Sequence, residues 1–423
     1  MKNVNTLWCA SLFLLTVSLM AADYRMTGKL DRNPAVYKVG ETITLTLQLL
    51  DGTNPAVGKQ VKYRIGSQPE KTVETGKEPL KLSGSMSHPG KLSFSAVAFD
   101  SDGKTVLKNA KGRPIHYGTG AMADPLKLKT SRKEPADFDA FWQAQIARLK
   151  TVPMTVKKEE VASRDKRFRT YNVEIAALSK TPASGYLSIP VNAKPGSLPI
   201  LFQTSGAGTK SAYKLMRTNM IVFHLNPHGC KNGQNKEYYD KFFSTIAKNY
   251  PHQGKTSRET SYFHGQTMRL LRALDYVKTL PEWNKKDLII SGTSMGGSQA
   301  IVGAALDPQV TVCIANDPAL CDHAGRLDKP ARRSGWPQLL NNDPKVLAAS
   351  DYYDNIFFAS RIKCDAYFAT GFCDNTCNSE GVYIAFNNVR GKKIMTTNPT
   401  AGHCGTSNVP GNKRITEIQK SVK

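Results

Sequence analysis

The chain lacks several features that would place it in a specialised class of protein. After residue 22 no stretch is long and apolar enough to cross a membrane. The sequence contains no internal repeat, no low-complexity tract, and no C-x-x-C or H-x-H pair of the kind that binds zinc. Lysines are spread widely and do not cluster with aromatic residues, so a formal net charge of +24 does not indicate nucleic-acid binding. With 40% hydrophobic and 22% charged residues, the composition is that of a globular protein.

The first 22 residues differ from the rest and predict a secretory signal peptide. Lys2 precedes an apolar run from Leu7 to Met20, and Ala21-Ala22 follows as a cleavage site. We therefore expect a secreted or periplasmic protein, free of the membrane after cleavage. One of the eight cysteines, Cys9, leaves with the signal, and the odd number that remains leaves at least one thiol unpaired.

A length of 423 residues favours two domains. Residues 23–117 alternate in the way half-buried β-strands do: Ile43, Leu45, Leu47 and Leu49 share one face, and polar residues share the other. Several such runs separated by turn signals predict a small immunoglobulin-like all-β sandwich. It holds no constellation of catalytic residue types, so we expect a spacer or packing partner, with a carbohydrate-binding module as the alternative.

Residues 118–160 are predicted to form a linker and a leading helix, and residues 161–423 an α/β domain. The leading helix has one apolar face, formed by Phe138, Phe141, Trp142, Ile146 and Leu149, and Trp142 is expected to be a core anchor. Beyond a first hairpin, continuous apolar strands alternate with helical patterns, which indicates a parallel sheet covered on both faces. Strands are predicted at 169–178, 184–190, 198–203, 220–225, 287–291, 310–315, 365–370 and 393–397, and helices at 239–248, 262–280, 297–306 and 381–388.

The stretch from Lys285 to Leu306 carries the strongest functional signal. Gly292, Ser294 and Gly296 form a G-x-S-x-G pattern between an apolar strand and a small-residue helix. In a nucleophile elbow the serine sits at the apex of a strained strand-to-helix turn, and the glycines leave room for it. The alternative is a glycine-rich turn whose serine merely caps a helix.

A serine nucleophile needs a base and an orienting acid, which follow it along the chain in this class of fold. Of the two later histidines, His403 follows the last strand and is favoured as the base, whereas His323 is expected at the surface. Asp374 comes just after the strand that ends near Thr370 and is the predicted acid. The other candidate carboxylates are expected to be solvated or to cap turns and helices; they are Asp317, Asp351, Asp354 and Asp365.

The oxyanion of the reaction requires two backbone N–H donors. Met295 follows the nucleophile, and Ala207 lies in a glycine-containing loop after an earlier strand, where Gly206 lets the backbone approach a substrate. The neighbouring Gly208-Thr-Lys-Ser211 lacks the spacing of a phosphate loop. We expect no cofactor and no metal.

The C-terminal cysteines offer two further readings. A zinc site formed by Cys373, Cys377 and Cys404 with His403 and Asp374 is disfavoured by their spacing. Because Cys373 and Cys404 flank the predicted acid and base, a disulfide between them is hypothesised, with Cys377 as the rival partner.

These motifs resemble those of the acetyl xylan esterase / cephalosporin C deacetylase family. The likeness runs from about Phe138 to the C-terminus and rests on Ser184-Gly-Tyr-Leu187, Pro227 to Gln234, Tyr262-Phe-His-Gly265, Leu280-Pro-Glu-Trp283, the elbow, and Gly371 to Gly381 with Ala401-Gly-His403. The resemblance implies an α/β-hydrolase that deacetylates O-acetylated sugars with a triad of Ser294, Asp374 and His403. It also implies Met295 and Ala207 as oxyanion donors and places Gly206 and His228 in substrate binding.

The chain departs from the family pattern around the nucleophile. Met295 stands where the family usually has glutamine, and His228-Gly-Cys230 stands for an arginine-glycine-glutamine motif. Ala207 replaces a tyrosine, and Cys404 a frequent glutamate. These departures bear on substrate preference more than on reaction type.

Acetylated carbohydrate is the predicted substrate, and the positive charge suggests an anionic polysaccharide as a further partner. Oligomerisation stays open. The alternatives are a peptidase on the same fold and a polysaccharide-binding protein whose hydrolase domain has lost activity.

Overall fold

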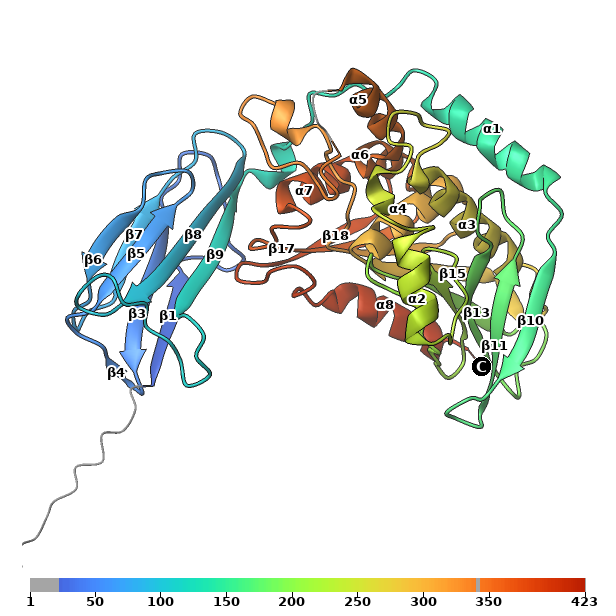
Figure 1. Cartoon of the computed structure of the whole chain (residues 1–423), viewed down its shortest axis with the longest axis horizontal. Helices are drawn as coiled ribbons and strands as arrows, with labels where there is room; N and C mark the ends of the chain where they lie inside the picture. Colours follow the sequence, from blue (N-terminus) through green and yellow to red (C-terminus); the bar gives the residue numbers. More distant parts are fainter. Residues whose placement is uncertain (1–22, 340–342, 423) are drawn as a thin grey trace, which may run out of the picture.

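The computed structural model describes residues 23–339 and 343–422, so the predicted signal peptide lies outside the described residues. An all-β part and a larger α/β part lie side by side (Figure 1). Within the described ranges, no helix has the length and apolar character needed to span a bilayer.

The N-terminal part is a sandwich of two sheets. One contains β1 (Tyr24–Leu30), β3 (Ile43–Asp51), β4 (Asn54–Pro55) and β7 (Leu80–Gly84). The other has the order β2 (Val36–Tyr37), β9 (His116–Ala123), β8 (Gly90–Phe99), β5 (Gln60–Ile65) and β6 (Lys71–Glu74). The predicted alternation in β3 is confirmed, because Ile43, Leu45, Leu47 and Leu49 are at most 3% exposed.

Strand β9 crosses the boundary predicted at residue 117. Its residues from Gly118 to Ala123 pair with β8, since the hydrogen-bond ladder of the sandwich continues to the end of this strand. A short 3-10 helix, η1 (Pro125–Lys127), and an extended connector then lead to α1 (Phe138–Thr151). The predicted linker therefore begins with six of the eight residues of a sandwich strand.

The α/β part is built on a nine-stranded sheet. Its strand order is β10 (Val156–Val161), β11 (Phe168–Ile175), β12 (Ala183–Pro190), β14 (Ile221–Asn226), β13 (Leu198–Thr204), β15 (Trp283–Thr293), β16 (Val312–Asn316), β17 (Asp365–Gly371) and β18 (Lys393–Asn398). The pairs from β10 to β14 are antiparallel, and those from β14 to β18 are parallel. The predicted hairpin and parallel sheet are confirmed, and β10 begins five residues before the boundary predicted at 161.

Helices cover both faces of this sheet because its central strands are apolar on both sides. On one face Leu201, Ile289 and Ile314 pack with α8 (Val409–Lys420), a helix that the sequence did not predict. The other face carries a larger core, and α4 contacts β15 and β16 there. The remaining α-helices are α2 (Lys236–Ser244), α3 (Tyr262–Val277), α4 (Met295–Leu306), α5 (Pro344–Ser350), α6 (Asn355–Phe358) and α7 (Ser379–Asn388). Trp142 of α1 is 1% exposed, as expected of a core anchor.

Candidate active site

Ser294 lies at the turn between β15 and α4, at the carboxyl end of the parallel strands. Its backbone has φ 61° and ψ −123°, an unfavourable conformation for a residue with a side chain. The turn holds it there: its N–H donates to the carbonyl of Asn316 (2.9 Å), and its carbonyl accepts from the N–H groups of Ser298 and Ala319 (both 3.0 Å). The structure thus has the strand–turn–helix geometry of a nucleophile elbow.

The two glycines of the elbow are required because β13 passes very close. A Cβ on Gly292 would lie 2.1 Å from Oγ1 of Thr204, and one on Gly296 would lie 2.7 Å from the Thr204 carbonyl oxygen. Oγ1 of Thr204 lies 2.7 Å from the carbonyl oxygen of Gly296, which fastens the end of β13 to the first turn of α4. Any larger residue at these positions would separate the elbow from the neighbouring loop.

Ser294, His403 and Asp374 form a continuous hydrogen-bonded chain. His403 Nε2 lies 2.9 Å from Ser294 Oγ, and His403 Nδ1 lies 2.8 Å from Asp374 Oδ2. The other carboxylate oxygen of Asp374, which is fully buried, accepts from the backbone N–H groups of Thr376 (2.7 Å) and Cys377 (2.9 Å). The hydrogen bond to Asp374 raises the pKa of His403 above its ordinary 6.5. This arrangement holds the Nδ1 proton toward the acid and leaves Nε2 to accept from the serine hydroxyl.

A second carboxylate, Asp317, fastens the loops that carry the acid and the histidine. Its Oδ1 accepts from the N–H of Gly371 and its Oδ2 from the N–H of Cys404, both at 3.1 Å. The prediction that Asp317 is solvated or a simple cap is wrong, because it is fully buried behind the triad. Burial, followed by the nearby Asp374, raises the pKa of Asp317 to about 6.

The two predicted oxyanion donors flank the nucleophile. Met295 is the first residue of α4, so its N–H has no acceptor within the helix. Its side chain is fully buried, and Sδ accepts from Nε2 of Gln266 (3.2 Å). On the other side, a Cβ built on Gly206 would be 3.9 Å from Cβ of Ser294, which brings the loop containing Ala207 beside the nucleophile.

His228 supports this loop from behind. Its Nε2 lies 3.0 Å from the carbonyl oxygen of Ala207, and its Nδ1 lies 2.8 Å from the hydroxyl of Tyr262. Burial lowers the pKa of His228 to about 4, so the ring is neutral; Nε2–H donates to Ala207 and Nδ1 accepts from Tyr262. Its side chain is completely buried, which suits it to hold the loop and not to touch a substrate.

A buried pair at the start of the same loop escaped the sequence analysis. Ser205 Oγ lies 2.6 Å from Nε2 of His224, and Nδ1 of His224 accepts from the N–H of Tyr213 (2.7 Å). Burial lowers the pKa of His224 to about 4. His224 lies within β14 and pairs in parallel with Gln203 of β13, and only that pairing could have revealed the contact.

His323, expected at the surface, is instead fully buried, and this prediction is wrong. Burial lowers its pKa to about 4. Asp354 is also buried, but it does cap α6, accepting from the N–H of Ile356 (3.1 Å) as well as from that of His323 (2.7 Å). Asp351 is buried in an ion pair with Arg132 and so is not solvated. Asp365 is half-buried, 3.8 Å from Nε of Arg414.

All seven cysteines of the described chain are free thiols, so the hypothesised disulfide between Cys373 and Cys404 is not formed. Cys404 is exposed, whereas Sγ of Cys373 is 3.5 Å from the carbonyl oxygen of Pro399. Cys377 is buried, and burial followed by the charge of Asp374 raises its pKa. Potential metal-ligand atoms of Asp374, Cys377 and His403 lie within 4.8 Å of one another, but both ring nitrogens of His403 already have partners.

Trp336, which the sequence analysis also missed, packs against the same apolar cluster as Ala207 of the oxyanion loop. It is half-buried and packs against the apolar cluster that contains Tyr250 and Met295, with Ala207 at the same cluster. Its ring centroid is 6.4 Å from that of Tyr250. It comes from the long loop between β16 and α5, and no local pattern marks it.

The elbow, at the carboxyl edge of a parallel sheet covered by helices, defines an α/β-hydrolase. A family model described as acetyl xylan esterase (AXE1) matches residues 123–419, and the chain belongs to this family of carboxylesterases. It is 31% identical over 399 residues to acetyl esterase Axe7A of Xylanibacter ruminicola, covering 88% of this chain and 85% of the relative.

Two solved structures share the fold. Acetyl xylan esterase from Paenibacillus sp. R4 superposes with a TM-score of 0.59 at 21% identity, over 71% of this chain and 98% of that one. Acetyl xylan esterase 1 from Thermoanaerobacterium sp. JW/SL YS485 superposes with a TM-score of 0.56 at 18% identity, over 70% and 97% of the two chains.

Proposed function

We propose that the protein is an exported serine esterase that removes O-acetyl groups from polysaccharides or oligosaccharides through a Ser294–His403–Asp374 triad. The single observation that carries this proposal is the hydrogen-bonded chain from Ser294 Oγ through His403 to Asp374, with distances of 2.9 and 2.8 Å. Membership of the acetyl xylan esterase family supports the class of substrate.

In the first half of the reaction, Ser294 Oγ attacks the acetyl carbonyl carbon while His403 Nε2 takes the hydroxyl proton. The oxyanion that forms is stabilised by the backbone N–H groups of Met295 and Ala207. His403 then returns the proton to the sugar oxygen as the ester bond breaks, which leaves an acetyl group on Ser294. Asp374 keeps the imidazole in the tautomer that this sequence of transfers needs.

In the second half, water attacks the acetyl-enzyme. His403 removes a proton from the water and then delivers it to Ser294 Oγ, so acetate leaves and the free enzyme is restored. Gly206 leaves room for the acyl group near Ser294. His228 keeps the Ala207 segment in place through its carbonyl oxygen.

The sugar is proposed to lie against the indole of Trp336, which is partly exposed and packs against the same apolar cluster as Ala207. The excess of positive charge favours acidic polysaccharides at the surface. Export rests on the apolar N-terminal run and is tested by N-terminal sequencing of the mature protein, which should begin near Asp23 in the periplasm or the medium.

The decisive experiment compares wild type and Ser294→Ala on an acetylated xylooligosaccharide, an aryl acetate and a peptide amide. We expect wild type to release acetate from both esters and to spare the peptide, and Ser294→Ala to lose activity by roughly 10⁴-fold or more. Full activity in Ser294→Ala would refute the nucleophile. Cleavage of the peptide would favour a peptidase, and glycan binding without turnover by wild type would favour a binding protein.

A further inference from the structure

The sandwich and the α/β part meet at the turn that carries the acid. Strand β9 passes so close to Phe372 that a Cβ on Gly120 would lie 2.9 Å from Phe372 Cβ and 3.1 Å from its carbonyl oxygen. Two residues earlier, a Cβ on Gly118 would lie 3.8 Å from Sγ of Cys373. Phe372 and Cys373 immediately precede Asp374, so the backbone of β9 packs against the acid turn. Strand β9 lies on the side of the sandwich that faces the α/β part (Figure 1).

The same strand also holds the start of the histidine loop. The carbonyl oxygen of Pro399 accepts from the N–H of Gly120 (2.9 Å) and from Oγ1 of Thr119 (3.2 Å), a side chain that is 1% exposed. Pro399 begins the segment that ends in His403. Strand β9 therefore touches both loops whose relative position sets the contact between Asp374 and His403.

Beyond β9, the adjacent strand β8 engages the residues that follow the acid. The backbone N–H of Lys91 donates to Oε1 of Glu380 in the first turn of α7, at 3.1 Å. Burial lowers the pKa of Lys91, whose amine is near enough to Glu380, Cys373 and Asp374 to feel their charge. The acid turn is thus enclosed between the two strands of the sandwich and α7.

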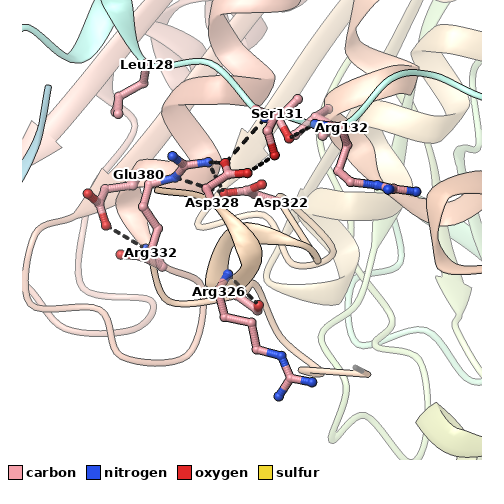
Figure 2. A network of polar contacts seen from close by, with 12 residues as sticks. Leu128, Ser131, Arg132, Asp322, Arg326, Asp328, Arg332 and Glu380 are labelled. Atoms are coloured by element: carbon pink, nitrogen blue, oxygen red, sulfur yellow. Dashed lines mark hydrogen bonds and ion pairs between the residues drawn. The ribbon is translucent and has the colours of Figure 1, made fainter. Parts of the chain in front are cut away.

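A second junction lies where the connector crosses the β16–α5 loop (Figure 2). Ser131 contacts the carboxylate of Asp328, which is paired with Arg332. Arg332 also pairs with the buried Asp322 at 3.0 Å. These contacts keep the connector, and the sandwich that precedes it, fixed against the loop that carries Trp336.

We propose that the N-terminal sandwich is a working part of the active site: through Thr119 and Gly120 it positions the acid turn and the histidine loop so that Asp374 and His403 meet. Thr119 and Gly120 are positioning residues, since they act through Phe372 and Pro399. This proposal rests on the proposed triad of Ser294, His403 and Asp374. It gives the sandwich a role in catalysis, where the sequence had offered carbohydrate binding as the alternative.

The physical reason is that a triad tolerates little displacement. A shift of about 1 Å in a catalytic group can cost roughly 100-fold in rate. The acid turn and the histidine loop hold each other through the N–H of Cys373 and the carbonyl of Ala401 (2.9 Å) and through Asp317. Strand β9 supports this pair of loops from the side of the sandwich. Phe372 is 1% exposed, and an α/β domain without the sandwich would expose it to solvent.

The test uses full-length variants with matched controls. Gly120→Ala introduces a Cβ 2.9 Å from Phe372, whereas Gly84→Ala introduces one 2.9 Å from Cγ2 of Ile65, inside the sandwich. Thr119→Val removes the hydroxyl that donates to Pro399, whereas Thr75→Val removes a buried hydroxyl that donates to Ala56, also within the sandwich. Tm, kcat and KM on an aryl acetate, and the pH dependence of kcat/KM, are measured for all four.

We expect Gly120→Ala and Thr119→Val to lower kcat by roughly tenfold or more, with little change in KM. The acidic limb of their pH profiles should move to lower pH, because a looser contact with Asp374 lowers the pKa of His403. The other titratable groups near the pair are Asp317, Cys377, Cys404, Cys373 and Lys91. Gly84→Ala and Thr75→Val should lose comparable Tm but keep kcat and the pH limb.

The proposal would be overturned if all four variants had the same kcat and the same acidic limb of the pH profile. It would also be overturned if kcat fell in proportion to the loss of Tm in the controls and in the β9 variants alike. Ser294→Ala separates this outcome from failure of the proposed function. Activity retained in Ser294→Ala refutes the triad itself, whereas an inactive Ser294→Ala with unaffected β9 variants refutes only the part assigned to the sandwich.

Discussion

Oγ of Ser205 lies 2.6 Å from Nε2 of His224, so the protein holds a second serine–histidine pair beside the first. The ring of His224 accepts at Nδ1 from the N–H of Tyr213, which leaves Nε2–H to donate to the serine. A histidine that donates to a serine cannot take its proton. The pair therefore fixes the start of the oxyanion loop and supplies no nucleophile.

Ser205→Ala should consequently lower kcat by roughly tenfold, because the loop that carries the Ala207 N–H loses its anchor. A fluorophosphonate probe should still label the variant at Ser294 and nowhere else, which peptide mapping by mass spectrometry can check. Labelling of Ser205 in wild type would contradict this view of the pair.

Asp374→Asn should reduce kcat by roughly 10³- to 10⁴-fold, since an amide does not hold the Nδ1 proton in place. The hydrogen bond to Asp374 raises the pKa of His403 above 6.5, and the base works only when unprotonated. In wild type, kcat/KM should therefore rise with pH, with a midpoint above 6.5. In Asp374→Asn the midpoint should move to lower pH, and an unmoved midpoint would show that another group controls the limb.

Asp317→Asn should change how stability depends on pH. The pKa of Asp317 is raised from 3.8 to about 6, so between about pH 4 and 6 the unfolded chain has lost a proton that the folded chain still holds. For this group, folding thus becomes less favourable as pH rises through that window, by roughly 3 kcal/mol at most. The free energy of unfolding of Asp317→Asn, relative to wild type, should increase from pH 4 to 6; urea titrations measure it. A constant difference across this range would contradict the expectation.

Trp336→Ala should weaken binding of the sugar without impairing the chemistry. Losing about 50 Å² of apolar contact corresponds to roughly 1.3 kcal/mol, or a tenfold rise in KM. We expect this rise on an acetylated xylooligosaccharide and none on an aryl acetate, which has no sugar ring to stack. Equal effects on both substrates would indicate that the indole merely supports the Met295 cluster.

The sequence could predict those parts of the site that are marked by a short local motif or by the order of residues along the chain. The elbow is a five-residue pattern between a strand and a helix, and Asp374 and His403 each follow a recognisable strand in the order that the fold imposes. The parallel sheet was predictable because its strands are apolar on both faces.

The parts that sequence could not predict depend on which distant segments meet. Asp317 is buried only because the loops after β17 and β18 close over it. His224 reaches Ser205 only because β14 lies beside β13 in the sheet. His323 was expected at the surface because its polar neighbours resemble a loop. Its segment is buried because the carboxylate of Asp354 accepts hydrogen bonds from the backbone N–H groups of Asp322 and His323. In each case a long-range contact overrides the local pattern.

The family match begins at residue 123, the final residue of β9. The family model therefore excludes nearly all of the strand that touches Phe372, although the alignment with acetyl esterase Axe7A covers 88% of this chain and so extends into the sandwich. In relatives that possess the sandwich, Gly120 and Phe372 should change together, because a larger residue at one position needs a smaller one at the other. A chimera that carries the sandwich of another such relative should keep its kcat only when the residue at position 372 is exchanged together with the residue at position 120.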